Sequence, residues 1–191
     1  MNDDTAFGAR AWTGALLLLA MVGCGSAGTV IDDAGADGGG PTPTLCPGPG
    51  CTPSGGVFLC ASGFLCTLPM SGDVDCAAGS TCVGTCAGSC DVDCTMGATC
   101  DIMTGESSSS SCDMSTCTVV SGASTSYTCT NGSTCDVTMG ASSSATCDGG
   151  SECQFTCTAS CGIECRDGSE CTVQCAGDSA PRSFTGAVAC E

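Results

Sequence analysis

Cysteine and aliphatic residues alternate with polar residues throughout the second half of the chain. Cys100 is followed two positions later by Ile102, and Val92 and Ile163 each stand midway between two cysteines, in "CDVDC" and "CGIEC". A period of two places every second side chain on the same face of a strand. The pattern therefore predicts β-strands whose cysteines point inward, and the abundant glycine, serine and threonine disfavour a helical repeat.

These strands belong to a repeat with a fixed period. Six units open with related phrases, namely "CAAGSTC", "CTMGATC", "CDMSTC", "CTNGSTC", "CDGGSEC" and "CRDGSEC". Their first cysteines stand at positions 76, 94, 112, 129, 147 and 165, so the period is 18 residues with one step of 17. A period of this length is typical of solenoids. We expect an all-β fold, a small disulfide-rich β-solenoid of about six 18-residue coils.

Strand geometry restricts how the cysteines pair. Residues four apart on a straight strand lie about 13 Å from each other, beyond the limit of about 7 Å between the α-carbons of a disulfide. Cysteines on either side of a bend can pair, and the bends are the opening phrases and the shorter "AGS" and "TAS" segments. This predicts bridges Cys76–Cys82, Cys86–Cys90, Cys94–Cys100, Cys112–Cys117, Cys129–Cys135, Cys147–Cys153, Cys157–Cys161 and Cys165–Cys171.

Cysteines are lost in pairs, as partners should be. One unit has Thr104 and Ser108 where another has Cys86 and Cys90, and a third unit also lacks both cysteines. The remaining cysteines suggest Cys175–Cys190, Cys60–Cys66 from the related phrase "CASGFLC", and Cys46–Cys51 by elimination. The alternative scheme joins cysteines of successive coils, which lie about 4.8 Å apart and are also within reach.

An apolar run, "AWTGALLLLAMVG", occupies residues 11–23 behind Arg10. It is too short to span a bilayer and has the length of a signal-peptide core. Its end, "MVGC", resembles the lipobox of bacterial lipoproteins, with Gly23 as the small residue and Cys24 as the cysteine that is lipidated. Setting Cys24 aside also leaves 22 of the 23 cysteines, an even number that can pair completely. The alternative is a soluble secreted protein in which Cys24 joins a disulfide.

The lipoprotein resemblance implies how the chain is organised. Residues 1–23 are then a lipoprotein signal peptide, and residues 24–45 are a lipidated tether, which their glycine, proline and acidic composition predicts to be disordered. We expect a cysteine-rich N-terminal cap region at residues 46–75, the repeats at residues 76–175 and a C-terminal tail or cap at residues 176–191. Gly25 stands where an aspartate would imply inner-membrane retention, so the resemblance favours the outer membrane or cell surface of the bacterial envelope.

The charge balance excludes several functions. The chain has 20 acidic residues, three arginines and no lysine or histidine, so it lacks the cations that neutralise nucleic-acid phosphates. Without histidine or lysine, acid-base and nucleophilic catalysis also lack their usual side chains. Glu152, Glu164 and Glu170 are the carboxylates that a catalytic pair would need, but outward positions on a polar coil favour solvated charge. We expect no enzyme, no cofactor and no metal site.

Two acidic pairs, Asp73 with Asp75 and Asp91 with Asp93, are possible oxygen ligands for a divalent cation. Their spacing differs from that of a calcium-binding loop. The cysteines likewise lack the compact Cys-x-Cys and Cys-x-x-Cys spacings that are typical of metal-binding proteins. A cysteine-rich metal-binding protein is nevertheless kept as an alternative function.

A second alternative is an ice-binding-like solenoid, because small disulfide-filled coils resemble certain insect antifreeze proteins. The outward positions do not repeat as a uniform array, however, and read Val83/Thr85, Asp101/Met103, Thr118/Val120, Asp136/Thr138, Gln154/Thr156 and Thr172/Gln174. The signal, tether and repeats together resemble cysteine-rich lipoproteins of some environmental Gram-negative bacteria. We therefore expect a noncatalytic, lipid-anchored envelope protein that serves as a rigid spacer or as a binding surface for an envelope protein, a glycan or a divalent cation.

Overall fold

The computed structural model describes residues 50–54, 57–68 and 71–191, which form strands joined by turns and bends without a helix. Accordingly, this part of the chain contains no apolar helix of bilayer-spanning length. The predicted signal peptide, the lipidation site Cys24, the tether and Cys46 lie outside the described residues.

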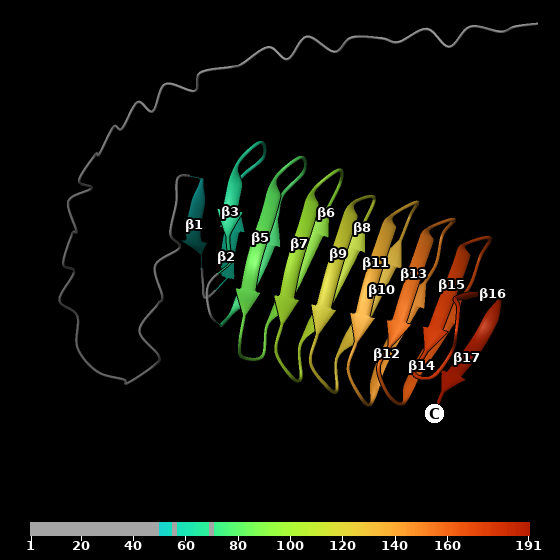
Figure 1. Ribbon diagram of the computed structural model, residues 1–191. Coiled ribbons are helices and arrows are strands. Elements are labelled where there is room, and N and C mark those ends of the chain that lie inside the picture. The colour runs from blue at the N-terminus through green and yellow to red at the C-terminus, as the bar shows by residue number, and fades with distance from the viewer. Residues whose placement is uncertain (1–49, 55–56, 69–70) are drawn as a thin grey trace, which may run out of the picture. The chain divides into compact units, whose positions relative to one another are not determined.

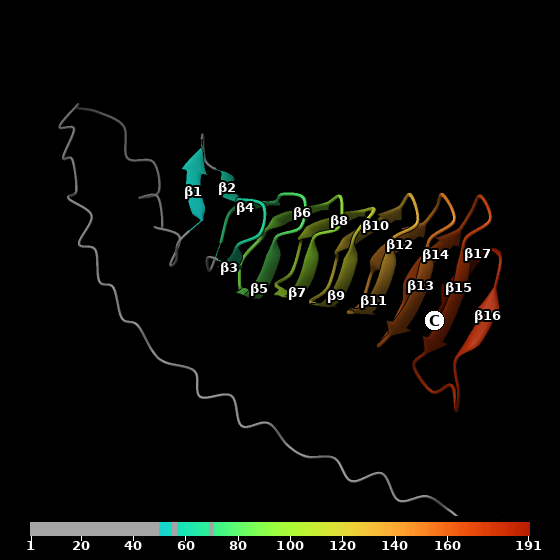
Figure 2. The ribbon, with the colours of Figure 1, turned by 90° about the horizontal axis from the view of Figure 1, so that it is seen from above.

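The strands form two sheets, which Figures 1 and 2 show as two layers running side by side. Sheet A has nine strands in the described part of the chain, in the order β1 (Cys51–Ser54), β2 (Val57–Cys60), β4 (Asp73–Cys76), β6 (Asp91–Thr95), β8 (Ser109–Asp113), β10 (Ser126–Thr130), β12 (Ser143–Cys147), β14 (Cys161–Cys165) and β17 (Gly186–Cys190). Sheet B has eight, in the order β16 (Arg182–Phe184), β15 (Glu170–Cys175), β13 (Glu152–Cys157), β11 (Thr134–Met139), β9 (Thr116–Ser121), β7 (Thr99–Thr104), β5 (Thr81–Cys86) and β3 (Leu65–Thr67).

Each coil contributes one strand to each sheet. From β2 to β14 in sheet A, and from β3 to β15 in sheet B, every strand pairs in parallel with the equivalent strand of the next coil. The register places equivalent cysteines opposite one another, as with Cys94 and Cys112. The same register holds across the 17-residue step, where Cys112 stands opposite Cys129. The predicted all-β, disulfide-rich solenoid of about six coils is confirmed.

In the described part of the chain, antiparallel strands close three of the four ends of the parallel ladders, and β3 is the end without one. Within the segment expected as an N-terminal cap region, residues 57–68 form a further coil in register with the repeats, and β1 pairs antiparallel with β2. In the expected C-terminal cap, β16 pairs with β15 and β17 pairs with β14, both antiparallel. A strand added in the opposite direction ends the repeating pattern while still satisfying the backbone groups of the last coil.

Cysteines and single apolar side chains fill the space between the sheets. Alternation along β13 buries Cys153, Phe155 and Cys157, and the side chain of Phe155 is among the largest that are fully buried. Cysteine accounts for much of the buried set, and most of the rest is valine, isoleucine, alanine or small polar residues. The interior between the sheets is therefore filled by small and medium-sized side chains.

The opening phrase of each repeat turns the chain from sheet A to sheet B. Asn131 and Gly132 have φ values of 57° and 77°, and Asp167 and Gly168 have values of 46° and 76°. Two successive residues with positive φ define a type I′ turn, for which Asn-Gly and Asp-Gly are the preferred sequences. The bend that brings the two flanking cysteines together thus follows directly from the local sequence.

Candidate functional site

Ten disulfides cross the corners of the coils in the described part of the chain. They join Cys60–Cys66, Cys76–Cys82, Cys86–Cys90, Cys94–Cys100, Cys112–Cys117, Cys129–Cys135, Cys147–Cys153, Cys157–Cys161, Cys165–Cys171 and Cys175–Cys190. Their α-carbon separations run from 5.4 Å to 6.6 Å. Eight of these are the pairs expected from strand geometry, and Cys60–Cys66 and Cys175–Cys190 are those expected from the related phrase and from the remaining cysteines. The scheme that joins successive coils is not adopted. Cys51 is also disulfide-bonded, whereas its expected partner, Cys46, lies outside the described residues.

In one coil that lacks the second disulfide, two hydroxyl groups meet at the same corner. Ser121 and Thr125 occupy the corner at which other coils have Cys157 and Cys161, and their side-chain oxygens lie 3.0 Å apart. Thr125 also donates to Ser143 Oγ of the next coil over 2.8 Å. In this coil a part-buried hydrogen bond thus takes the place of the missing disulfide.

A row of buried serines runs along the opposite corner. The backbone N–H of Ser115 donates to Ser133 Oγ, that of Ser133 to Ser151 Oγ, and that of Ser151 to Ser169 Oγ, over 3.1–3.2 Å. We call these four residues the serine row. The sequence signal is the serine that recurs two residues before the second cysteine of the opening phrases, where the sequence alone indicates only a bend. Its side chain also links successive coils.

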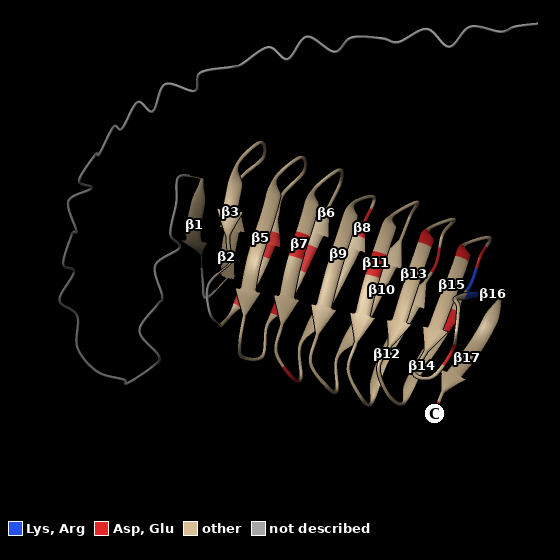
Figure 3. Cartoon of the chain, viewed as in Figure 1, with Lys and Arg blue, Asp and Glu red and all other residues tan. Residues whose placement is uncertain are grey.

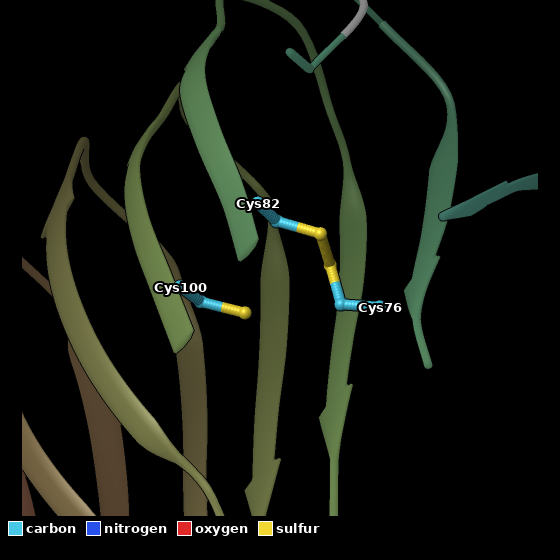
Figure 4. Close-up of side chains that lie close together, drawn as sticks. All are labelled: Cys76, Cys82 and Cys100. Atoms are coloured by element: carbon cyan, nitrogen blue, oxygen red, sulfur yellow. A yellow bond between two sulfur atoms is a disulfide. The ribbon is translucent and has the colours of Figure 1, made fainter. Parts of the chain in front are cut away.

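Sulfur atoms of neighbouring coils approach one another inside the solenoid. The Sγ atoms of Cys76, Cys82 and Cys100 all lie within 4.8 Å of each other, although they come from two coils. Figure 4 shows the Cys76–Cys82 bridge with the Cys100 side chain directed toward it. Three sulfurs at this spacing are a possible ligand set for a soft metal, but each belongs to a closed disulfide and carries no thiolate charge.

Acidic residues occur along both sheets (Figure 3), while the two described arginines, Arg166 and Arg182, belong to the C-terminal part of the chain. Asp75 on β4 stands opposite Asp93 on β6. Partial burial, and then the like charges of Asp93 and Asp73, raise the pKa of Asp75. Next to them, Ser109 and Ser111 of β8 donate to Asp91 and Asp93.

The fold brings Asp73, Asp75, Asp91 and Asp93 onto two adjacent strands of one outer face, where all four are exposed. Carboxylate oxygens in this arrangement attract cations and repel other acidic chains. The two acidic pairs recognised in the sequence thus form a single patch, which we call the aspartate patch.

The outer face of sheet B has one column of threonines beside a column of different residue types. Thr81, Thr99, Thr116 and Thr134 are register partners on four successive strands. This column precedes the second cysteine of each phrase, so it is not among the outward positions that follow that cysteine. The neighbouring outward column contains Val83, Asp101, Thr118, Asp136 and Gln154, so the face as a whole is not a uniform threonine array.

The three candidate catalytic carboxylates do not form one group. Glu152 and Glu170 are register partners on the outer face of sheet B, where they line a groove of about 500 Å³ beside β16. Glu164 lies on β14 in sheet A and accepts a hydrogen bond from Arg166. That hydrogen bond, together with the charge of Arg166, lowers the pKa of Glu164. The groove also contains Asp136 and Gln154, and no basic side chain lines it.

No family model, no curated protein and no solved structure matches the chain.

Proposed function

We propose that the chain is a noncatalytic, lipid-anchored protein of the bacterial cell envelope whose solenoid serves as a rigid spacer or binding surface. The observation that carries this proposal is the set of buried disulfides at successive corners of the coils. Such bonds persist in oxidising compartments and are rare in the bacterial cytosol. An interior held by sulfur therefore suits a protein that works outside the cytoplasm.

The distribution of cysteines supports an anchor at Cys24. The ten corner bridges use every cysteine from Cys60 onward, and Cys51 is disulfide-bonded. Cys24 directly follows the apolar run and is separated from the coils by a segment rich in glycine, proline and acid. On this proposal the signal peptide is removed at Cys24, a lipid holds the new N-terminus in the membrane, and residues 25–45 separate the solenoid from the lipid surface.

The regular backbone supports a spacer or display role. Each coil contacts its neighbours through two parallel ladders and is closed by a covalent bridge, so bending requires several coils to change together. Large aromatic anchors of protein interfaces are scarce, because phenylalanine, tyrosine and tryptophan make up 4% of the chain. The aspartate patch and the acidic groove are the surfaces on which we propose that an envelope protein, a glycan or a divalent cation binds.

Membrane fractionation tests the anchor. The full-length chain expressed in a Gram-negative host should enter the outer-membrane fraction, and Cys24→Ser should leave it. Gly25→Asp serves as a matched control, because the lipoprotein resemblance predicts that it keeps the lipid but retains the chain in the inner membrane. If Cys24→Ser stays in the membrane fraction, the lipid anchor is ruled out.

Intact-mass measurement after alkylation without reduction tests the oxidised interior. The exported protein should carry no alkylated cysteine among positions 46–190. Many reactive thiols would instead favour the metal-binding alternative, which zinc or copper titration would then examine. Binding screens of the oxidised protein against envelope glycans, calcium and magnesium would separate a binding surface from a plain spacer.

A further inference from the structure

The sulfur atoms form two series of close contacts that extend beyond single bridges. Besides the group Cys76, Cys82 and Cys100, the Sγ atoms of Cys94, Cys100 and Cys117 lie within 4.8 Å of one another, and so do those of Cys112, Cys129 and Cys135. Each group contains one closed disulfide and a sulfur of the bridge in an adjacent coil. These three groups connect four consecutive bridges, which we call the first sulfur series.

A second series is separate from the first. It comprises Cys147, Cys153 and Cys171, whose Sγ atoms also lie within 4.8 Å of one another. In the described part of the chain, no such group joins the Cys129–Cys135 bridge to the Cys147–Cys153 bridge.

We propose that the first sulfur series is a thiol–disulfide exchange path, along which a single open thiol can move from coil to coil. A thiolate at Cys100 attacks Sγ of Cys82, the Cys82–Cys100 bond forms, the Cys76–Cys82 bond breaks, and Cys76 leaves as the new thiolate. The numbers of disulfides, thiolates and electrons stay unchanged. In the wild type, an external monothiol that opens one bridge as a mixed disulfide supplies the first thiolate.

The new bond is compatible with the fold. Cys82 and Cys100 are register partners on β5 and β7, where parallel strands lie about 4.8 Å apart. This separation falls within the range of α-carbon distances that a disulfide tolerates, from about 4.4 Å to 6.8 Å. The exchanged bridge therefore requires side-chain rotation but no displacement of a strand.

Movement in the other direction follows the same chemistry. The Cys100 thiolate can attack Sγ of Cys117, which releases Cys112, and Cys112 then lies within 4.8 Å of Cys129 and Cys135. The path should end at Cys129 and Cys135, because in the described residues no group of three sulfurs within 4.8 Å of one another joins this bridge to the bridge of the next coil. All these cysteines are at least 97% buried, so the exchange takes place inside the molecule and is shielded from large reductases.

The opposite corner supplies a natural contrast. Cys86 is bridged to Cys90, but its register partner in the next coil is Thr104. A thiol at Cys86 therefore has no disulfide of the next coil to attack at that corner. Thiol–disulfide exchange between coils should therefore not occur at that corner.

Disulfide mapping of Cys94→Ser tests the proposal. The substitution leaves Cys100 unpaired in an otherwise oxidised protein. After incubation at mildly alkaline pH, alkylation followed by peptide mapping should find thiol label on Cys76 and Cys112 as well as on Cys100, within about an order of magnitude of one another. New Cys82–Cys100 and Cys100–Cys117 bridges should accompany the label. Cysteines of the second series should stay unlabelled.

Cys90→Ser is the matched control, and its label should remain on Cys86. Far-UV circular dichroism under the same conditions must show that both variants keep their strands. If folded Cys94→Ser carries its label on Cys100 alone after long incubation, the exchange path is refuted. Label that appears equally in both series would also refute it, because it would indicate exchange through unfolded chains. None of these results depends on the lipid anchor.

Discussion

Small hydroxyl side chains have a larger role than the sequence pattern suggests. Ser133 is 1% exposed, accepts the N–H of Ser115, and donates its hydroxyl to the backbone carbonyl of Cys112 over 2.9 Å. A buried hydroxyl that satisfies several backbone groups cannot be removed without leaving some of them unpaired. The serine row therefore contributes to stability in a way that hydrophobic patterning does not reveal.

Ser133→Ala should lower the free energy of unfolding by about 1–3 kcal/mol, because the Ser115 N–H loses its acceptor in the interior. Denaturant titration of the oxidised protein measures the change. Ser144→Ala, at an exposed position on β12, should have almost no effect. Equal stabilities of the two variants would show that the serine row adds nothing.

The ionisation of Asp75 on the outer face of sheet A should make the stability of the protein depend on pH. Because partial burial and neighbouring aspartates raise the pKa of Asp75, the folded chain binds a proton there more readily than the unfolded chain does. The contribution of Asp75 to stability is thus fully present below the unfolded pKa near 3.8 and is lost as the pH rises through the folded value. Asp75→Asn should raise the melting temperature at pH 7 and remove this part of the pH dependence.

Asp101→Asn is the control for that measurement. Its register partners on the outer face are Val83 and Thr118, so no acidic residue stands directly beside it. A rise in melting temperature at pH 7 that is as large for Asp101→Asn as for Asp75→Asn would show that net charge, rather than the aspartate patch, controls the effect.

The repeated strands could be predicted from the sequence, whereas the strands that close the ladders could not. Period two along "CDVDC" and the 18-residue step fixed the strands, their buried faces and the corner pairing, because each depends on local geometry. The coil at residues 57–68 lies 16 residues before the next unit in register, so the 18-residue period does not identify it as a repeat. Strands β1, β16 and β17 carry no repeated phrase, so their antiparallel closure depends on tertiary contacts that a repeat pattern does not encode.

A corner without cysteines should accept a new bridge. Ser121 and Thr125 occupy the positions of a disulfide pair, and their side-chain oxygens already lie 3.0 Å apart. The double variant Ser121→Cys/Thr125→Cys should therefore form an additional disulfide on export and gain about 2 kcal/mol of stability from the small closed loop. Intact mass should show the loss of two hydrogen atoms, and denaturant titration should show the gain.

Val120→Cys/Thr125→Cys is the geometric control, because Val120 points outward from β9 and Thr125 points inward. This pair should stay reduced. A bridge that forms as readily in the control would show that the corner geometry does not select the pairing.

At the scale of the whole molecule, cross-links replace the large core of an ordinary domain. The chain has 191 residues and a net charge of −17, and its buried side chains are mainly cysteine, valine and small residues. Each short disulfide loop contributes about 2 kcal/mol in the loop-entropy model, so the ten bridges together exceed the net stability of a typical domain, about 5–15 kcal/mol. Self-repulsion of the acidic faces acts in the opposite direction.

Complete reduction should therefore unfold the solenoid without any denaturant. Reduction followed by alkylation should abolish the β-strand signal in far-UV circular dichroism at 25 °C and low salt, whereas the oxidised protein should keep that signal to high temperature. A higher salt concentration screens the carboxylates. It should restore part of the circular dichroism signal of the reduced chain if charge repulsion contributes to unfolding in addition to the loss of the disulfides. If the fully alkylated chain retains its strands at low salt, the serine row and the parallel ladders are sufficient, and the disulfides only slow unfolding.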